Sequence, residues 1–499
     1  MSSKVLQRWN PENASFWQQS GHSIANRNLW ISIPCLFLAF AVWMVWSMVV
    51  VKLPDVGFNY TKNQLFWLTA LPALSGATLR IFYSFLVPIF GGRRWTAIST
   101  ASLLLPAIGI GYAVQDPNTP YPTMMLLALL CGLGGGNFSS SMSNINFFFP
   151  KAKKGYALGM NAGLGNLGVS GMQFIVPVVM TMALFGAIGG ESQTLVKDGV
   201  SKAIWLQNAG FVWVPFIVLS SIAAWFGMND IASAKASFSE QSVIFQRKHN
   251  WIMCWLYLGT FGSFIGFAAG FPLLIKGQFP DVDPAKFAFL GPLVGAITRS
   301  VGGSIADKLG GAKVTFWVFL LMVLSVFAVI NFMPTKGADG VLMGGNFIGF
   351  FVAFLCLFAL TGVGNASTFK MIPVIFLTHH ERLAQANKNI SREKVMQDSN
   401  KEAAAVLGFT SAIGAYGGFF ILTEKGKHLF KKVFQEVIVP RIPVSPRNIK
   451  IVGYSLFIYF WISKPCSTYP SFTKKQSLLI LYGQKEMDTK RRNYSSKRD

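Results

Sequence analysis

Two arginines lie deep inside long apolar segments of the sequence, Arg80 and Arg299. Each is followed eleven residues later by a glycine pair and nearby basic residues, Gly91-Gly92-Arg93-Arg94 in one copy and Gly310-Gly311-Ala312-Lys313 in the other. An arginine at the centre of a membrane helix costs at least about 2.5 kcal/mol, so it marks a functional site by default. The planar guanidinium donates paired hydrogen bonds to oxyanions. The repeat therefore predicts a duplicated transporter that holds an anion between two cationic side chains.

Both arginines are expected close to the middle of the membrane. Each lies roughly ten residues before the end of its apolar segment, which corresponds to about 12–15 Å along a helix. The interior of the apolar segments contains no Asp or Glu, and Asp307 and Glu402 fall only at segment ends. Because two uncompensated guanidiniums facing one cavity repel each other, we expect an anion between them.

The segments that must position these arginines are long enough to cross a bilayer. The chain is 52% hydrophobic and only 13% charged, which excludes an ordinary soluble globular protein. Runs of about 18 or more apolar residues are typical of spanning helices. Eleven are evident, at about 30–51, 65–90, 95–114, 121–149, 155–184, 205–227, 251–277, 287–306, 314–334, 347–377 and 402–422. We expect an all-α polytopic membrane protein.

A second internal echo supports duplication. The run Gly134-Gly135-Gly136-Asn137-Phe138 resembles Gly362-Val363-Gly364-Asn365-Ala366, and a polar stretch separates the two halves. Two parallel repeats of this kind describe the major facilitator fold, with two six-helix bundles and the substrate between them. The expected divisions are a cytoplasmic segment 1–29, a bundle 30–227, a cytoplasmic linker 228–250, a bundle 251–422 and an atypical tail 423–499.

Glycines are dense in the fifth and eleventh apolar segments, 159–168 and 408–418. Small residues at this frequency let membrane helices approach closely. We assign gating or packing roles to five of them, Gly163, Gly165, Gly168, Gly414 and Gly417. In the fifth segment Asn161 and Asn166 could also donate amide hydrogen bonds to an oxyanion, although packing alone explains the glycines equally well.

Several motifs point to one family. The run from Gly134 to Ile145, the following Phe147-Phe148-Phe149-Pro150, and Gly163-Leu164-Gly165-Asn166 resemble the nitrate/nitrite porter family of the major facilitator superfamily, of the bacterial NarK and NarU type. The segment Tyr257 to Phe267 and both arginines also match, and the similarity runs from about residue 10 to 421.

The resemblance implies substrates, a location and a binding site. Nitrate and nitrite would be the anions, with membrane lipid as the surroundings of a monomer in a bacterial inner membrane. No cofactor, metal, nucleic acid or catalytic residue is expected, because no nucleophile–base set or metal cluster is evident. The implied substrate-binding residues are Arg80, Arg299, Tyr257, Asn166, Phe138 and Phe261. The arginines would hold the anion from opposite halves, Tyr257 and Asn166 would donate to it, and the phenylalanines would cover its faces.

Charge favours exchange of nitrate against nitrite. A proton-coupled carrier usually places a titratable group within the membrane, and no histidine or carboxylate lies mid-segment here. Without an anion, closing the halves would bring two cations together in a low dielectric. The alternatives are a proton-coupled nitrate symporter, a facilitator for another small oxyanion, and a non-transporting nitrate-binding sensor or inactive carrier.

Basic residues predict a cytoplasmic N-terminus. With that orientation, the cytoplasmic side before residue 423 carries 18 lysines and arginines and the other side 7, as the positive-inside rule requires. One further lysine, Lys370, falls inside the tenth segment, where relatives are usually uncharged. Its side chain could extend to the cytoplasmic edge, which we favour, or add a third cation to the pathway.

The tail departs from the family pattern after Ile421. Residues 423–499 hold 16 basic and 5 acidic residues, so +11 of the formal charge of +24 belongs to them, and the total charge does not indicate nucleic-acid binding. Their only apolar run, Ile451 to Ile462, is shorter than the roughly 17 residues a spanning helix needs, which makes a twelfth helix doubtful. A reading-frame change explains such a tail best; an authentic basic tail attracted to anionic lipid is the alternative.

Overall fold

The long apolar segments form helices because a backbone in lipid must satisfy its hydrogen bonds within the segment. The computed structural model describes residues 4–197, 200–234, 242–336, 342–386 and 391–422. The predicted tail 423–499 lies outside the described residues, as do positions 235–241 of the predicted linker. The question of a twelfth helix therefore falls outside them too.

The first half of the chain contains most of the short elements. Its elements are β1 (Val5–Leu6), α1 (Ala14–Phe16), α2 (His22–Met44), α3 (Trp46–Lys52), α4 (Lys62–Phe90), α5 (Gly92–Ala101), α6 (Leu104–Ala113), α7 (Tyr121–Phe148), α8 (Lys151–Val179), β2 (Gln193–Lys197), β3 (Val200–Ile204), α9 (Asn208–Phe211), α10 (Val214–Gly227) and β4 (Asp230–Ile231). Strand β1 pairs in parallel with β4, and β2 and β3 form an antiparallel hairpin.

The second half is built from longer helices. Its elements are α12 (Lys248–Tyr257), α13 (Ser263–Gln278), α14 (Leu290–Leu309), α15 (Gly311–Asn331), β5 (Thr335–Lys336), β6 (Leu342–Met343), α16 (Phe347–Ala386) and α17 (Arg392–Leu422). A π-helical turn, Leu258–Gly262, joins α12 to α13. Such turns are rare and often occur at functional sites.

Ten helical segments of the described residues are long and apolar enough to cross a membrane. The one remaining predicted segment, 287–306, forms α14, which is less apolar because it carries Arg299, Asp307 and Lys308. Helix α14 packs against α16 and α8. Helix α16 ends at Ala386 rather than at the predicted 377, and α17 begins at Arg392 rather than at the predicted 402. Both helices are longer because polar residues continue them past the apolar region.

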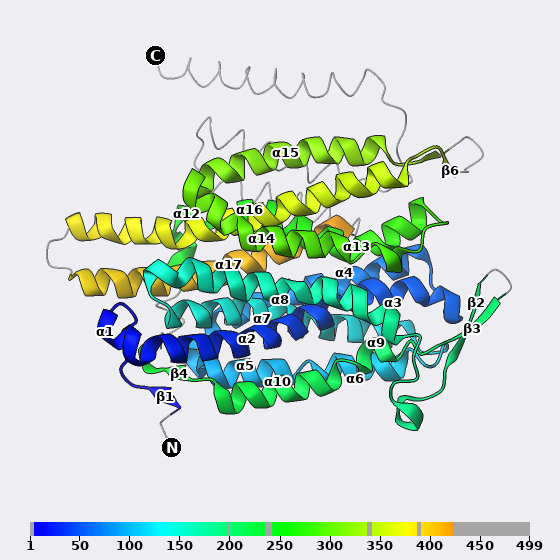
Figure 1. Ribbon diagram of the computed structural model, residues 1–499, viewed down its shortest axis with the longest axis horizontal. Helices are drawn as coiled ribbons and strands as arrows, with labels where there is room; N and C mark the ends of the chain where they lie inside the picture. Colours follow the sequence, from blue (N-terminus) through cyan, green and yellow to red (C-terminus); the bar gives the residue numbers. More distant parts are fainter. Residues whose placement is uncertain (1–3, 198–199, 235–241, 337–341, 387–390, 423–499) are drawn as a thin grey trace, which may run out of the picture. The chain divides into compact units, whose positions relative to one another are not determined.

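The long helices run alongside one another in Figure 1, and their two ends differ in character. Both hairpins, β2–β3 and β5–β6, lie at one end, which we call the hairpin end. The opposite end carries α1, the last turns of α16, the first turns of α17, and the start of α8 with Lys151 to Lys154; we call it the basic end.

The two halves place their arginine helices in equivalent surroundings. Helix α4, with Arg80, packs closely on α7, and α14, with Arg299, packs closely on α16. The echoed glycine runs of α7 and α16 lie at these two contacts. A methyl group added to Gly135 would lie 2.7 Å from the Gly76 Cα, and one added to Gly362 would lie 3.0 Å from the Arg299 backbone nitrogen. The repeated sequence thus corresponds to a repeated helix contact.

The five glycines singled out from the sequence lie at close helix contacts. Added methyl groups would meet Ser300 at Gly163, Leu36 at Gly165, the Phe37 carbonyl at Gly168 and Tyr257 at Gly414, and the Gly417 Cα lies 2.9 Å from a methyl group placed on Gly262. Of these, Gly163 brings α8 of the first half onto α14 of the second, and Gly414 brings α17 onto the tyrosine that contacts Arg299.

Substitution of Gly135 by alanine should destabilise the first half. The added methyl group would lie 2.7 Å from both the Gly76 backbone and the Trp43 ring, and such overpacking costs about 1–3 kcal/mol. We expect a lower midpoint of thermal unfolding in detergent. The matched control is Gly277→Ala on α13, where an added methyl group meets nothing within 4 Å. An equal effect of both substitutions would contradict this packing argument.

Candidate anion-binding site

Arg80 is fully buried and only partly hydrogen-bonded. Its Nε donates to the Gly135 carbonyl at 2.5 Å and its Nη1 to the Ser411 carbonyl at 3.0 Å. Gly135 belongs to the first half and Ser411, on α17, to the second, so Arg80 bridges the two halves. Its Nη2 is buried and has no hydrogen-bond partner among the residues that the structure describes. A buried donor without a partner is costly, which makes this nitrogen a position for a ligand.

Arg299 is buried in the equivalent helix of the second half, with an exposed fraction of 3%. Its Nη2 donates to the Tyr257 hydroxyl at 3.0 Å, while its Nη1 is buried and has no hydrogen-bond partner in the described part of the chain. The hydroxyl accepts this bond and keeps its own proton available to donate. Tyr257 precedes the π-helical turn, which carries Phe261 four residues later.

Aromatic rings hold the two guanidiniums. Phe138 of α7 and Phe261 stack on each other with centroids 5.8 Å apart and an interplanar angle of 20°. The Arg80 Cζ lies 4.8 and 5.0 Å from these two centroids, and the Arg299 Cζ lies 5.4 and 5.7 Å from them. Both guanidiniums therefore face the same two rings, and each gains cation–π stabilisation there. One guanidinium and one ring come from each half.

The two phenylalanines contact each other in this structure. Rings that sandwich a planar ion must lie roughly 7 Å apart, twice the usual contact distance of about 3.5 Å. The centroids of Phe138 and Phe261 are 5.8 Å apart. The predicted arrangement, with the rings on either face of the anion, thus requires the rings to separate.

Asn166 is the one predicted binding residue that lies apart from this network. It is buried on α8, and neither its amide nitrogen nor its amide oxygen has a hydrogen-bond partner among the described residues. It follows Gly163 by one helical turn, and Gly163 lies against Ser300 beside Arg299. Its neighbour in the motif, Asn161, instead donates to Ser141 at 2.8 Å.

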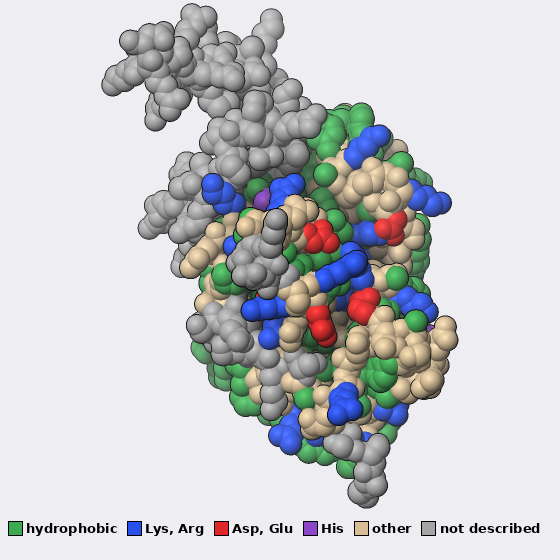
Figure 2. Space-filling model, turned by 90° about the vertical axis from the view of Figure 1, so that its left-hand side faces the viewer, with side chains coloured by type: hydrophobic (Ala, Val, Ile, Leu, Met, Phe, Trp, Pro, Cys, Tyr) green, Lys and Arg blue, Asp and Glu red, His purple; other side chains and the backbone are tan. Residues whose placement is uncertain are grey.

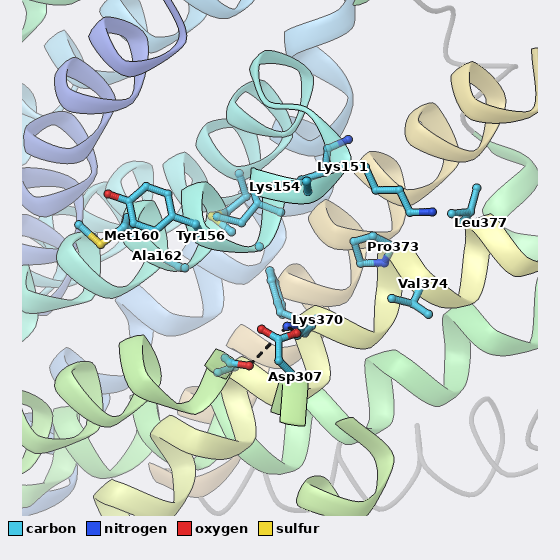
Figure 3. Close-up of a pocket in the computed structure, with 18 of the residues that line it drawn as sticks. Lys151, Lys154, Tyr156, Met160, Ala162, Asp307, Lys370, Pro373, Val374 and Leu377 are labelled. Carbon is cyan, nitrogen blue, oxygen red and sulfur yellow. Dashed lines mark hydrogen bonds and ion pairs between the residues drawn. The ribbon is translucent and has the colours of Figure 1, made fainter. Parts of the chain in front are cut away.

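A cavity of about 620 Å³ extends from Arg299 toward the basic end. Figure 3 shows Lys151 and Lys154 of α8, Lys370 of α16 and Asp307 of α14 along its wall. Arg80 does not line it. An anion that enters from the basic end therefore meets Arg299 before Arg80.

Contacts between the halves close the hairpin end. The Lys276 ammonium of α13 lies 3.1 Å from the Asp55 carboxylate and donates to the Val51 carbonyl at 2.7 Å. Deeper in the bundle, Gln173 of α8 donates to the Ala268 carbonyl at 2.8 Å. The halves are thus joined at the hairpin end, while at the basic end a cavity lies between them beside the hydrogen bond from Lys154 to Asn400.

Carboxylates of the described residues lie away from the two arginines. Glu402 was expected at the start of its helix, but α17 begins ten residues earlier and Glu402 is buried. It pairs with Arg247 at 2.6 Å and with His380 at 2.7 Å. Because Arg247 lies at the start of α12, this cluster belongs to the basic end. The described residues also contain no group of three or more His, Cys, Asp or Glu that could hold a metal ion.

Two residues that sequence reasoning missed, Trp43 and Phe369, lie at the guanidiniums, and a third, Asn365, lies on the same helix as Phe369. The Arg80 Cζ lies 4.8 Å from the Trp43 ring, and the Arg299 Cζ lies 5.4 Å from the Phe369 ring. Asn365, one turn before Phe369, is fully buried with an unpartnered amide. Its place in the echoed glycine run was the only signal in the sequence; nothing distinguished Trp43 and Phe369 from ordinary membrane aromatics.

Comparisons with known proteins agree on one family. The family model of the Major Facilitator Superfamily matches residues 35–421. The nitrate/nitrite transporter NarU of Escherichia coli (strain K12) is 52% identical over 427 residues, which cover 85% of this chain and 90% of NarU. A probable nitrate/nitrite antiporter of Thermus thermophilus, NarK2, is 45% identical over 420 residues, 83% of this chain and 88% of that protein.

A solved structure shares the fold. The inward-facing, unoccupied crystal structure of a bacterial homologue of the human lysosomal transporter Spinster superposes with a TM-score of 0.55 at 12% sequence identity, covering 88% of this chain and 97% of that one. Together with the apolar helices, these matches identify a multi-pass membrane protein. The chain belongs to the major facilitator superfamily and, within it, to the nitrate/nitrite transporter family that includes NarU and NarK2.

Proposed function

We propose that this protein exchanges nitrate and nitrite across a bacterial inner membrane by alternating access, with the anion held between Arg80 and Arg299. The observation that carries the proposal is the pair of buried guanidinium nitrogens, Arg80 Nη2 and Arg299 Nη1, which come from opposite halves and have no hydrogen-bond partner within the described part of the chain. The relatives named as nitrate/nitrite transporters supply the identity of the anion.

Exchange follows from the charges around the site. The two guanidiniums share the same aromatic pair, and neither forms an ion pair with a carboxylate among the described residues. Closing both halves on an empty site brings two cations together in a medium of low dielectric, where their repulsion is strong. A bound monovalent anion offsets that repulsion, so either nitrate or nitrite permits reorientation and an empty site does not.

Proton coupling has weaker support. Glu402 is a buried carboxylate that could in principle carry a proton, but it already pairs with Arg247 and His380 at the basic end. A carboxylate held by two partners is stabilised in its charged form.

The chain also supplies both arginines by itself, which supports a monomer as the transporting unit.

Replacement of either arginine by lysine should strongly reduce exchange. Lysine cannot form the paired hydrogen bonds of a guanidinium, and a bond to a charged group contributes about 1.5–3 kcal/mol. We expect Arg80→Lys and Arg299→Lys to reduce nitrate uptake into nitrite-loaded proteoliposomes by about 10- to 100-fold. The control is Arg94→Lys, which changes an exposed arginine of the first half.

The same assay separates the alternatives. Uptake by the unmodified protein only when nitrite is inside supports exchange, whereas uptake driven by a proton gradient into empty vesicles would replace it with symport. Nitrate-dependent thermal stabilisation without any uptake would identify a nitrate-binding protein that does not transport.

Tyr257→Phe should weaken nitrate binding and lower stability together. The substitution removes the acceptor for the Arg299 Nη2 and leaves a second buried guanidinium nitrogen unpartnered, at a cost of about 1–3 kcal/mol. Thermal unfolding with and without nitrate measures both effects. Tyr112→Phe, at an exposed tyrosine, should change neither; unaltered nitrate stabilisation in Tyr257→Phe would exclude the tyrosine from the site.

We place the N-terminus and the basic end in the cytoplasm. The excess of basic residues in the loops of that side, 18 against 7, supports this orientation. A fluorescent reporter that matures only in the cytoplasm, fused to the N-terminus, should be bright. If only a reporter that is active in the periplasm gave a signal at the N-terminus, the proposed orientation would be reversed.

A further inference from the structure

The lining of the cavity at the basic end contains more basic than acidic side chains. Its wall carries four basic side chains, Lys151, Lys154, Arg299 and Lys370, against the carboxylates of Asp307 and Glu381. Figure 2 views this end of the molecule, where a few acidic side chains lie among more numerous Lys and Arg side chains. A cleft lined by one sign of charge concentrates ions of the opposite sign.

Lys370 lies on the path to Arg299. Arg299, Gly303 and Asp307 follow one another at four-residue intervals on α14, so they share one face, about 6 Å apart along the axis. The Lys370 ammonium forms an ion pair with Asp307 and lies 3.5 Å from the Gly303 carbonyl. It therefore lies one to two turns from Arg299, toward the basic end. Its neighbour Phe369 contacts the Arg299 guanidinium directly.

The partners of Lys370 leave it able to hold an anion. The Asp307 side chain is 58% exposed and that of Lys370 is 27% exposed, so solvent screens their attraction. An ammonium has three donors, and the contacts of Lys370 occupy two directions. Across the cavity, Lys154 is buried and uses one donor on the Asn400 side chain at 3.0 Å.

We propose that Lys370 forms a second anion subsite in the mouth of the cavity, on the cytoplasmic side of Arg299, and that Asp307 competes with the anion for it. The ligand class is a small monovalent oxyanion. The subsite rests on the proposed function for its role: it captures nitrate or nitrite from the cytoplasm and passes it to Arg299. Asp307 keeps the capture weak, because its carboxylate must be displaced each time.

Binding can be tested without transport. Arg80→Lys removes a ligand of the central site but does not touch the cavity, since Arg80 does not line it. In that background we expect calorimetric titration with sodium nitrate to show residual weak binding. Adding Lys370→Gln should abolish the residual binding, and adding Asp307→Asn should tighten it about threefold or more. Residual binding that survives Lys370→Gln would overturn the proposal, whether or not the protein transports.

Transport kinetics then test the role of the subsite. In inverted membrane vesicles, which expose the cytoplasmic face, Lys370→Gln should raise the KM for nitrate about three- to tenfold, and Lys370→Arg should restore it. The KM measured in right-side-out vesicles should not change. The control is Lys313→Gln, which removes an exposed charge at the same end but outside the cavity. An equal rise in KM on both faces, or an equal effect of Lys313→Gln, would show that Lys370 acts through the fold alone.

Discussion

The burial of two like charges at one site is the constraint on which the rest of this structure depends. Arg80 and Arg299 are both taken out of water, and no carboxylate of the described residues neutralises either one. The fold offsets part of the cost with backbone carbonyls, the Tyr257 hydroxyl and the faces of Phe138 and Phe261. Each guanidinium nevertheless keeps one nitrogen without a hydrogen-bond partner among the described residues. In the proposed function, a bound anion supplies the missing partner.

The glycine-rich helices follow from this constraint. For one guanidinium to reach carbonyls of both α7 and α17, these helices must approach α4 closely, and side chains at their contacts would hold them apart. Gly76, Gly135 and Gly408 lie at those contacts, where an added methyl group would strike neighbouring atoms. Likewise, Gly163 lets α8 lie against α14. The same small residues that permit the close contacts leave few steric barriers to a sliding or rocking movement between the halves.

The asymmetry between the two ends gives the central site a direction. Ion-pair and hydrogen-bond contacts between the halves hold the hairpin end, whereas a cationic cavity leads from the basic end to Arg299. Arg80 lies beyond that cavity and contacts α17 of the other half. The two arginines thus have different roles in this conformation: Arg299 faces the approach of the anion, and Arg80 ties the halves together.

The sequence by itself determined the fold class and the family, because apolar length and motif spacing are local signals. The predicted all-α major facilitator fold and the resemblance to nitrate/nitrite porters are confirmed. Tertiary structure decided everything that depends on contacts between distant segments. It paired Lys370 with Asp307, placed Trp43 and Phe369 on the guanidiniums and moved Glu402 into a buried cluster. No local pattern encodes such pairings, since each joins helices that are far apart in the chain and meet only when the bundle packs.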